Sequence, residues 1–202
     1  MKKECVLAMA LTCAWVLPAH QLAAKPQTAP AAGSAWRITS RGAGPIRFGM
    51  TVMQAKRAMP NAKFARSTDG DGVALIAVTQ AGKELLSLHA GEDDPARPIN
   101  YRKKISYIEV RDPRYRTDTG ISPGMRLAAA EQKLGPVRVV DWSEIESREY
   151  VTFARQSQGT SFRVTSPDGS VGVYPKDTGP PAKSKKYTPG STIFSIILTG
   201  PR

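Results

Sequence analysis

Two Asp-Thr-Gly triplets, Asp118-Thr119-Gly120 and Asp177-Thr178-Gly179, are the most suggestive catalytic pattern in this sequence. Aspartic proteases bring two such triplets together so that two carboxylates share one proton. Here the triplets lie too close in sequence to belong to two protease lobes, and neither follows an apolar strand that would bury its carboxylate. Lys176 and Pro180 also flank the second triplet. We therefore interpret both triplets as turns in which aspartate is the turn-forming residue.

Histidine and cysteine, which often supply metal ligands and nucleophiles, are scarce. The chain has two of each, namely His20, His89, Cys5 and Cys13. All but His89 lie in a leader that we expect to be removed. A mature chain with one histidine and no thiol can form no HExxH motif, multi-histidine metal site, disulfide or cysteine nucleophile.

The other catalytic patterns are absent or weak. No G-x-S-x-G elbow is present that would let His89 activate a serine. Gly42-Ala43-Gly44 lacks the lysine and the preceding strand of a phosphate-binding loop. Glu144, Glu146 and Glu149 could act as paired carboxylates only if the fold brings two acids together. We predict that the protein is not an enzyme and has no catalytic residue, metal or cofactor; a small carboxylate-dependent hydrolase is the alternative.

Residues 1–24 have the three-part order of a secretory signal peptide. Two lysines precede an apolar run over residues 5–17, and Leu22-Ala23-Ala24 supplies small residues for a signal peptidase, with Leu17-Pro18-Ala19 as a second choice. The apolar run is shorter than the about 20 residues that span a membrane, and no later segment is apolar enough to do so. We expect a periplasmic or secreted protein with no transmembrane segment after signal removal.

A lipoprotein signal is the alternative, because cleavage just before Cys13 would allow acylation of that cysteine. Such signals place glycine or alanine directly before the cysteine, whereas Thr12 stands there in this chain. We therefore favour export without a lipid anchor on Cys13.

The chain is strongly basic, with 29 Lys and Arg against 17 Asp and Glu and a formal net charge of +12. Removal of residues 1–24 takes away two positive charges and one negative charge, and leaves +11. A basic protein outside the cytoplasm meets lipid headgroups and polyanionic cell-wall polymers before it meets nucleic acid. We predict an anionic envelope polymer, lipid headgroups or a protein as the partner, and no nucleic acid.

Positive charge and tyrosine are concentrated between residues 101 and 116. Arginine and lysine donate hydrogen bonds to anions, and tyrosine rings stack on sugars or bases. In a strand over 105–110, Ile108 and Val110 would face the core and Tyr107 the open side. A solvated strand between positive loops is the alternative. The predicted binding residues are Tyr101, Arg102, Lys103, Lys104, Tyr107, Arg111, Arg114 and Arg116.

Periodicity and turn residues predict a flexible tether over 25–35 and one α+β domain over 36–202. Two short helices are expected, over 52–59 and 126–134, together with antiparallel sheets. Prolines, glycines and lysines between 175 and 191 predict an irregular, mobile basic loop. The expected strands are 36–40, 46–48, 73–79, 84–89, 105–110, 137–142, 149–155, 160–166, 171–174 and 192–198.

Similar segments precede the two helices, Ile46-Arg47-Phe48-Gly49-Met50 before the first and Ile121-Ser122-Pro123-Gly124-Met125 before the second. Each helix is then followed by strands. This order allows two similar helix-plus-sheet halves. The alternative is that the two segments are unrelated, because a glycine commonly precedes a helix.

Three segments, taken in order, are informative about ancestry: residues 42–46, Ile105-Ser106-Tyr107-Ile108-Glu109-Val110, and Asp118-Thr119-Gly120-Ile121-Ser122-Pro123-Gly124-Met125 before a helix that ends at Leu134-Gly135. In this order they resemble the family typified by the sigma-E-regulated envelope lipoprotein, the 1131-numbered family of domains of unknown function. The likeness covers residues 36–199. It implies an exported α+β domain of envelope-stress context, without an established activity, and it supplies no catalytic residues.

The sequence as a whole therefore favours a non-catalytic binding or scaffolding module. We expect it to contact an anionic envelope component or a protein partner through the surface formed by residues 101–116.

Overall fold

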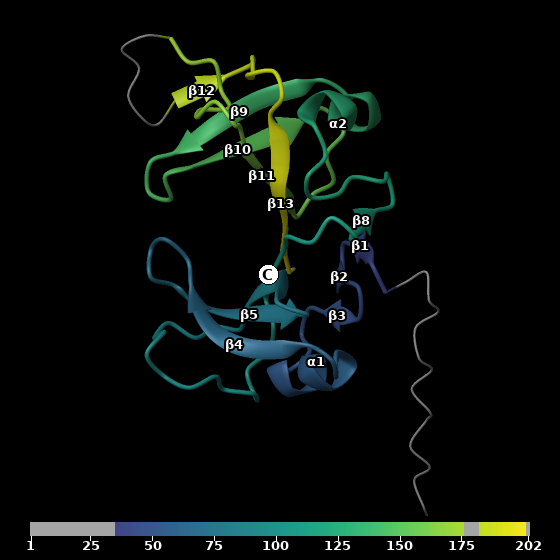
Figure 1. Ribbon diagram of the computed structural model, residues 1–202, viewed down its shortest axis with the longest axis vertical. Coiled ribbons are helices and arrows are strands. Elements are labelled where there is room, and N and C mark those ends of the chain that lie inside the picture. The colour runs from purple at the N-terminus through teal and green to yellow at the C-terminus, as the bar shows by residue number, and fades with distance from the viewer. Residues whose placement is uncertain (1–34, 176–181, 201–202) are drawn as a thin grey trace, which may run out of the picture.

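The computed structural model describes residues 35–175 and 182–200 (Figure 1). The predicted signal peptide, nearly all of the predicted tether and the triplet at Asp177 lie outside these residues. Within the described ranges, neither helix has the length and hydropathy that crossing a bilayer requires.

Two short helices and two mainly antiparallel sheets make up this part of the chain, which confirms the predicted α+β class. In chain order the elements are β1 (Arg37–Thr39), β2 (Gly42–Ala43), β3 (Ile46–Arg47), α1 (Val52–Ala58), β4 (Lys63–Thr68), β5 (Ala74–Gln80), β6 (Lys83–His89), β7 (Tyr107–Val110), β8 (Arg116–Thr117), α2 (Leu127–Leu134), β9 (Val137–Ser143), β10 (Arg148–Phe153), β11 (Thr160–Thr165), β12 (Ala182–Ser184) and β13 (Thr192–Thr199).

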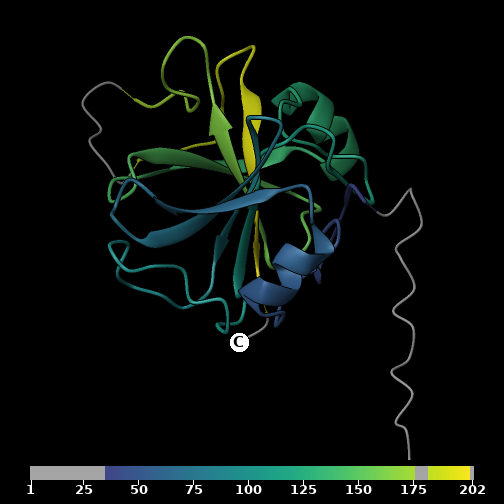
Figure 2. The same cartoon turned by 60° about the horizontal axis from the view of Figure 1, so that its bottom comes forward.

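A nine-stranded antiparallel sheet, in the order β12-β9-β10-β11-β13-β7-β6-β5-β4, is the main body of the molecule. A four-stranded sheet, β3-β2-β1-β8, contains one parallel pair, β1 with β8. The two helices and the small sheet lie on the same side of the large sheet (Figure 1, Figure 2). Among the residues that the structure describes, no helix or second sheet covers the opposite face of the large sheet.

The large sheet contains two copies of one arrangement, which confirms the predicted similar halves. In the first half, α1 leads into the meander β4-β5-β6, and a long connection then brings β7 back beside β6. In the second half, α2 leads into β9-β10-β11, and β13 returns beside β11. The halves join where β7 pairs with β13. The short strand β12 is an addition to the second half, at the outer edge of β9.

The repeated Gly-Met step before each helix has the same backbone role in both halves. The N–H of Gly49 donates to the carbonyl of Ile105 at 2.9 Å, and that of Gly124 donates to Ile193 at 2.7 Å. Each isoleucine N–H donates back to the carbonyl of the methionine after the glycine, at 2.8 and 2.9 Å. These bonds tie the chain before each helix to the segment that becomes the fourth strand.

The core lies between the large sheet, the helices and the small sheet. Ile108 and Val110 of β7 are fully buried, as predicted, and so are Val52 of α1 and Leu127 of α2. One contiguous cluster of buried apolar side chains includes residues of both halves. The alternate residues of β7 must consequently point to the uncovered face.

Strand β4 was not predicted, because its sequence has little apolar character. Phe64 is its only large apolar residue. Arg66 binds Glu92 at 2.8 Å and is largely covered. The strand ends the sheet and has a neighbour on one side only, so fewer of its positions need an apolar side chain.

The strand predicted over 171–174 is wrong, and the irregular structure predicted over 175–191 is wrong for Ala182–Ser184. The segment makes one isolated antiparallel bridge, Gly172 with Tyr187, and the N–H groups of Val171 and Gly172 donate to the carboxylate of Glu149 at 2.6 and 2.7 Å, so the bridge does not extend into a strand. Ala182–Ser184 pairs with β9 instead and forms β12. Residues 176–181 of the predicted mobile loop lie outside the described residues.

Replacing either helix-preceding glycine tests the equivalence of the halves. Gly49 and Gly124 have φ angles of 78° and 82°, and an alanine there would be strained although its Cβ would meet no atom within 4 Å. We expect Gly49→Ala and Gly124→Ala each to lower the unfolding free energy by about 1 kcal/mol. Urea denaturation measures this change. Gly70→Ala, at a glycine without a positive φ, serves as control. A loss of unfolding free energy in only one of the Gly49 and Gly124 variants would contradict the equivalence of the two halves.

Candidate functional site

The uncovered face of the large sheet presents mainly polar side chains from its central strands. On β7, Tyr107 and Glu109 point away from the core because Ile108 and Val110 point into it. Strand pairing places Ile197 of β13 opposite Glu109, and Arg163 of β11 opposite Tyr150 of β10. We call this side of β7, β13, β11 and β10 the open face.

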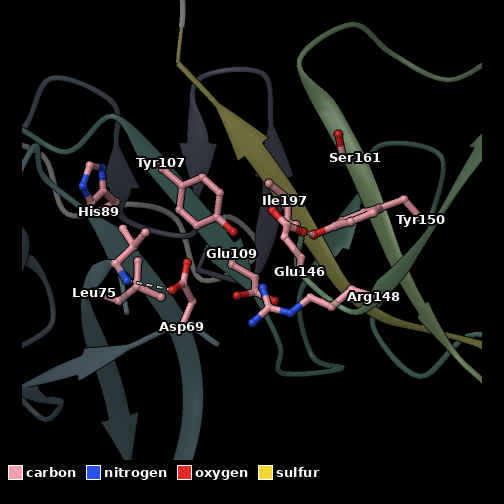
Figure 3. Close-up of a pocket in the computed structure, with 11 residues that line it drawn as sticks. Asp69, Leu75, His89, Tyr107, Glu109, Glu146, Arg148, Tyr150, Ser161 and Ile197 are labelled. Atoms are coloured by element: carbon pink, nitrogen blue, oxygen red, sulfur yellow. Dashed lines mark hydrogen bonds between the residues drawn. The ribbon is translucent and has the colours of Figure 1, made fainter. Parts of the chain in front are cut away.

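A pocket of about 340 Å³, which we call the central pocket, lies in the open face and is lined by both halves (Figure 3). Two hairpin turns flank it, β4–β5 from the first half and β9–β10 from the second, and these turns lie opposite each other in Figure 1. The lining residues are Asp69, Val73, Leu75, His89, Tyr107 and Glu109 from the first half, and Glu146, Arg148, Tyr150, Ser161 and Ile197 from the second.

Glu109 is the buried charge of the open face, with only 2 % of its surface exposed. The hydroxyl of Ser195 donates to its Oε1 at 2.6 Å, and Nη2 of Arg111 donates to its Oε2 at 3.0 Å. Burying a carboxylate costs several kcal/mol unless such partners compensate it. Because Ser195 belongs to β13 and Glu109 to β7, this hydrogen bond also links the two halves.

An aromatic ring supports the arginines around Glu109. Phe194 is 38 % exposed, and the guanidinium groups of Arg111 and Arg163 lie 5.6 and 4.4 Å from its ring centroid. Arg111 also binds Glu84 at 3.3 Å. These contacts hold the arginines at fixed places on the sheet.

The two tyrosines of the central pocket stay neutral over a wide pH range. Burial and the carboxylate of Glu109 raise the pKa of Tyr107 above its ordinary value. Burial and the hydrogen bond that Tyr150 donates to Glu146 raise the pKa of Tyr150. Both phenols therefore remain hydrogen-bonding groups on apolar rings, a combination that suits contact surfaces.

The two hairpin turns that flank the central pocket each carry an exposed apolar side chain. Ile145, in the β9–β10 turn, is 85 % exposed, and Val73, in the β4–β5 turn, is 40 % exposed. A single exposed aliphatic residue needs no explanation. Two of them, on the two turns that flank one pocket, form part of a surface that a partner could cover.

The first predicted binding group, Tyr101 to Lys104, lies beside α1 and not on the open face. The N–H groups of Val52 and Met53, at the start of α1, donate to the carbonyls of Lys103 and Tyr101 at 3.0 and 2.9 Å. The ring of Tyr101 lies 5.1 Å below the Nζ of Lys56. The side chains of Arg102, Lys103 and Lys104 are exposed. This segment therefore closes the first turn of α1 and presents three positive charges to solvent.

Arg114 and Arg116 lie beside the small sheet. Arg114 binds Asp112 at 2.9 Å and stacks on the ring of Trp36, 4.0 Å from its centroid. Arg116 is exposed and shares a shallow depression with Asp118. The eight predicted residues thus fall in three places, and only Tyr107 and Arg111 come together on the open face. Whether any of them binds a ligand stays a prediction.

The acidic candidates have separate roles. Glu146 lines the central pocket, Glu144 is exposed, and Glu149 binds backbone N–H groups away from that pocket. Asp118 lies in a turn and pairs with Arg37 at 2.6 Å. Among the described residues, no group of three or more His, Cys, Asp or Glu side chains could hold a metal ion.

Sequence reasoning did not select Glu109, Arg148, Tyr150 and Arg163. For β7, the alternation that placed Tyr107 on the open side also placed Glu109 there, so the signal was present. For Arg148, Tyr150 and Arg163, the alternation of polar residues with Val151 and Val164 was the available signal. Their proximity to β7 depends on the pairing of β13 with both β11 and β7, which no local pattern encodes.

The fold is similar to that in the crystal structure of the uncharacterized protein yfeY from Escherichia coli. The TM-score is 0.51, the sequence identity is 15 %, and the match covers 81 % of this chain and 99 % of that chain. The two proteins share a fold. A scan against protein-family models found no match, and a search of curated proteins found none. The resemblance to the sigma-E-regulated lipoprotein family therefore stays a prediction.

Removing the charge of Glu109 tests its role in holding the open face. Glu109→Gln is expected to lower the unfolding free energy by roughly 2–3 kcal/mol, because Arg111 and Arg163 lose a covered counter-charge. Denaturant titration measures the loss. Glu84→Gln is the control, since Glu84 also binds Arg111 but is 32 % exposed at its side chain, and we expect it to cost less than about 1 kcal/mol. Equal losses in the two variants would contradict this role.

The tyrosines predict a decline of stability at high pH. Their pKa is raised in the folded chain, so the stability is complete below the pKa of the unfolded chain, near 10, and is lost as pH rises toward the folded value. Each such tyrosine contributes up to about 1.4 kcal/mol per pH unit to the slope. Unfolding free energies should be measured from pH 9 to pH 11, roughly the window set by a phenol's ordinary pKa. They should fall less steeply with pH in Tyr107→Phe and Tyr150→Phe than in the unmodified protein. Slopes equal to that of the unmodified protein would refute the raised pKa values.

Proposed function

We propose that the protein is a non-catalytic binding module of the cell envelope that receives a protein partner on the open face of its large sheet. The observation that carries this proposal is the central pocket, which both halves line and whose flanking turns carry the exposed side chains of Val73 and Ile145. Tyrosine and arginine contribute most to binding energy at protein interfaces. Tyr107, Tyr150 and Arg148 supply these residue types at the pocket.

The open face is also held in place before a partner arrives. Tyr107, Tyr150 and Arg148 stand on paired strands of the large sheet. The hydrogen bond from Ser195 to Glu109 and the ion pair of Glu109 with Arg111 hold the side chains where the two halves meet. A preorganised surface loses little side-chain entropy on association, which favours affinity.

The state of the carboxylates supports binding over hydrolysis. A hydrolase of the glycosidase type needs one carboxyl group to transfer a proton and a second to attack or activate water. Both oxygens of Glu109 accept hydrogen bonds, from Ser195 and Arg111, and Glu146 accepts one from Tyr150. Acids that are held by the protein in this way are suited to organising a surface.

Export to the envelope is part of this proposal and is supported by the signal-like order of residues 1–24. An anionic envelope component is a second candidate partner, favoured by one observation. Arg102, Lys103 and Lys104 are consecutive exposed cations beside α1. Such a contact would be electrostatic and would weaken strongly with added salt.

Site-directed photocrosslinking in the source organism tests the proposed partner site. A photoreactive phenylalanine analogue at position 145 or 150 should form adducts of one defined mass with an envelope protein, because Tyr150 lines the central pocket and Ile145 is an exposed residue of a turn that flanks it. The same analogue at Gln132, an exposed position on α2, is the matched control and should form none. Tyr107→Ala should reduce the adducts from position 145 by roughly tenfold, as expected for an interface hot spot.

Two outcomes would oppose the proposal. Equal adducts from positions 132 and 145 would show that the open face is not preferred. Loss of all adducts in a chain with Arg102, Lys103 and Lys104 changed to glutamine, but not in Tyr107→Ala, would favour the anionic contact beside α1.

A further inference from the structure

Next to the central pocket, a second pocket of about 280 Å³, which we call the arginine pocket, lies at the ends of β10 and β11 and is lined from both faces of the sheet. Arg148 lines both pockets, so the two adjoin. The arginine pocket lies where the β9–β10 turn approaches the turn after β11. Its lining residues are Trp142, Ser147, Arg148, Glu149, Arg163, Val164, Thr165, Gly169 and Ser170.

We propose that the arginine pocket binds a carboxylate side chain of the protein partner between Arg148 and Arg163. This inference rests on the proposed function, since it names the chemical group by which the partner is recognised.

The hydrogen-bond donors of Arg163 support the assignment. Its guanidinium stacks on the ring of Phe194, 4.4 Å from the centroid. Its Nη1 lies 3.9 Å from Oε1 of Glu109, which is too long for a hydrogen bond. No side chain or carbonyl among residues 35–175 and 182–200 accepts a hydrogen bond from this guanidinium. A stacked guanidinium keeps its N–H groups at the edge, where they can bind an oxyanion in a two-pronged manner.

Arg148 adds a second positive charge at the same pocket. Burial and the nearby charge of Arg148 lower the pKa of Arg163. Arg148 itself has Glu109, Glu146 and Tyr150 near it. Glu109 and Tyr150 act on the pKa of Arg163 in the opposite direction, but they do not outweigh burial and the charges of Arg148 and Arg111. An anion placed between the two guanidinium groups would relieve their repulsion and gain charge-assisted hydrogen bonds.

Glu149, the one acid in the lining, does not fill this role. Its carboxylate accepts hydrogen bonds from the N–H groups of Val171 and Gly172, at 2.6 and 2.7 Å, and from the hydroxyl of Tyr174 at 2.7 Å. These three donors occupy it on the side of the 171–174 segment. The hydroxyls of Ser147, Thr165 and Ser170 complete the polar lining.

The open face already shows a bound carboxylate. Glu109 is held by one arginine, Arg111, and one serine hydroxyl, Ser195. The arginine pocket offers the same two kinds of donor, arginine and hydroxyl, to a group that comes from outside. Because Arg148 belongs to both pockets, a partner segment seated in the central pocket can place an adjacent acidic side chain there. This continuity favours a carboxylate of the partner over a free phosphate.

Titration of the full mature chain with N-acetylglutamate N-methylamide tests the inference. The guanidinium NMR signals of Arg148 and Arg163 should shift with saturation, and the neutral glutamine analogue should leave them unchanged. Arg148→Gln and Arg163→Gln should each weaken binding about tenfold, the size expected for a charge-assisted hydrogen bond. Arg163→Lys keeps the charge but not the planar fork, and should weaken binding by an intermediate factor. Arg138→Gln, at an exposed position of β9, removes the same charge elsewhere and should have no effect.

The outcomes separate this inference from the proposed function. Equal shifts with the glutamine analogue, or equal weakening by Arg138→Gln, would overturn it. Inorganic phosphate that binds more tightly through the same two arginines would overturn the choice of carboxylate. Crosslinks from positions 145 and 150 without any glutamate-dependent shift would leave the proposed function standing and reject the arginine pocket. If Arg163→Gln does not fold, the binding of the glutamate analogue to Arg148→Gln and Arg163→Lys still tests the inference.

Discussion

The antiparallel pairing of β7 with β13 is the contact on which the rest of the molecule depends. Each half is a helix with a four-stranded meander, and the fourth strand of each becomes the inner edge of that half. Val110 pairs with Ile196 and Ile108 with Leu198, so apolar residues of both strands enter one core. Without this pairing each half would expose an unpaired strand edge and part of its apolar face, both of which favour association with other chains.

The pairing also explains why a charge is buried at the centre of the open face. Glu109 lies on the junction, and its hydrogen bond from Ser195 crosses from β7 to β13. A buried ion pair is weak evidence for stability, because desolvation offsets much of the attraction. It does, however, require one relative placement of the two strands if the carboxylate is to keep its donors. Glu109 is therefore better understood as fixing the register of the halves than as strengthening their contact.

Local patterns predicted the elements that bury one clear stripe or face. Both helices and the β5–β6 hairpin were expected within one or two residues, since their apolar spacing and turn residues agree. Segments that lack a clear apolar face, or whose backbone groups bond to distant residues, were not predicted from local patterns. β4 is a polar edge strand, and the 171–174 segment gives two of its backbone donors, those of Val171 and Gly172, to Glu149, a residue more than twenty positions earlier. Such non-local competition leaves no trace in a short window of sequence.

The same limit applies to the candidate site. Clustering of arginines and tyrosines along residues 101–116 predicted one surface, but the chain turns from α1 to the open face and then to the small sheet within that stretch. The alternation along β7 was enough to assign Tyr107 to the open side. The partners of Tyr107 come from β9–β10 and β13, whose positions depend on the packing of the second half against the first. Only the completed sheet brings them together.

Similar backbones with different side chains make the open face asymmetric. The matched bonds of Ile105 and Ile193 align the two fourth strands, so that Tyr107 corresponds to Ser195 and Glu109 to Ile197. A symmetric ligand would gain nothing from such a surface, because each of its halves would meet different chemistry. The β4–β5 turn supplies Asp69, and the β9–β10 side supplies Glu146, Arg148 and Tyr150, with the guanidinium of Arg148 reaching across to the β4–β5 turn beside Gly70. A partner that distinguishes these sides must itself have a direction along its length, as a polypeptide segment has, because the two sides present different hydrogen-bonding and charged groups.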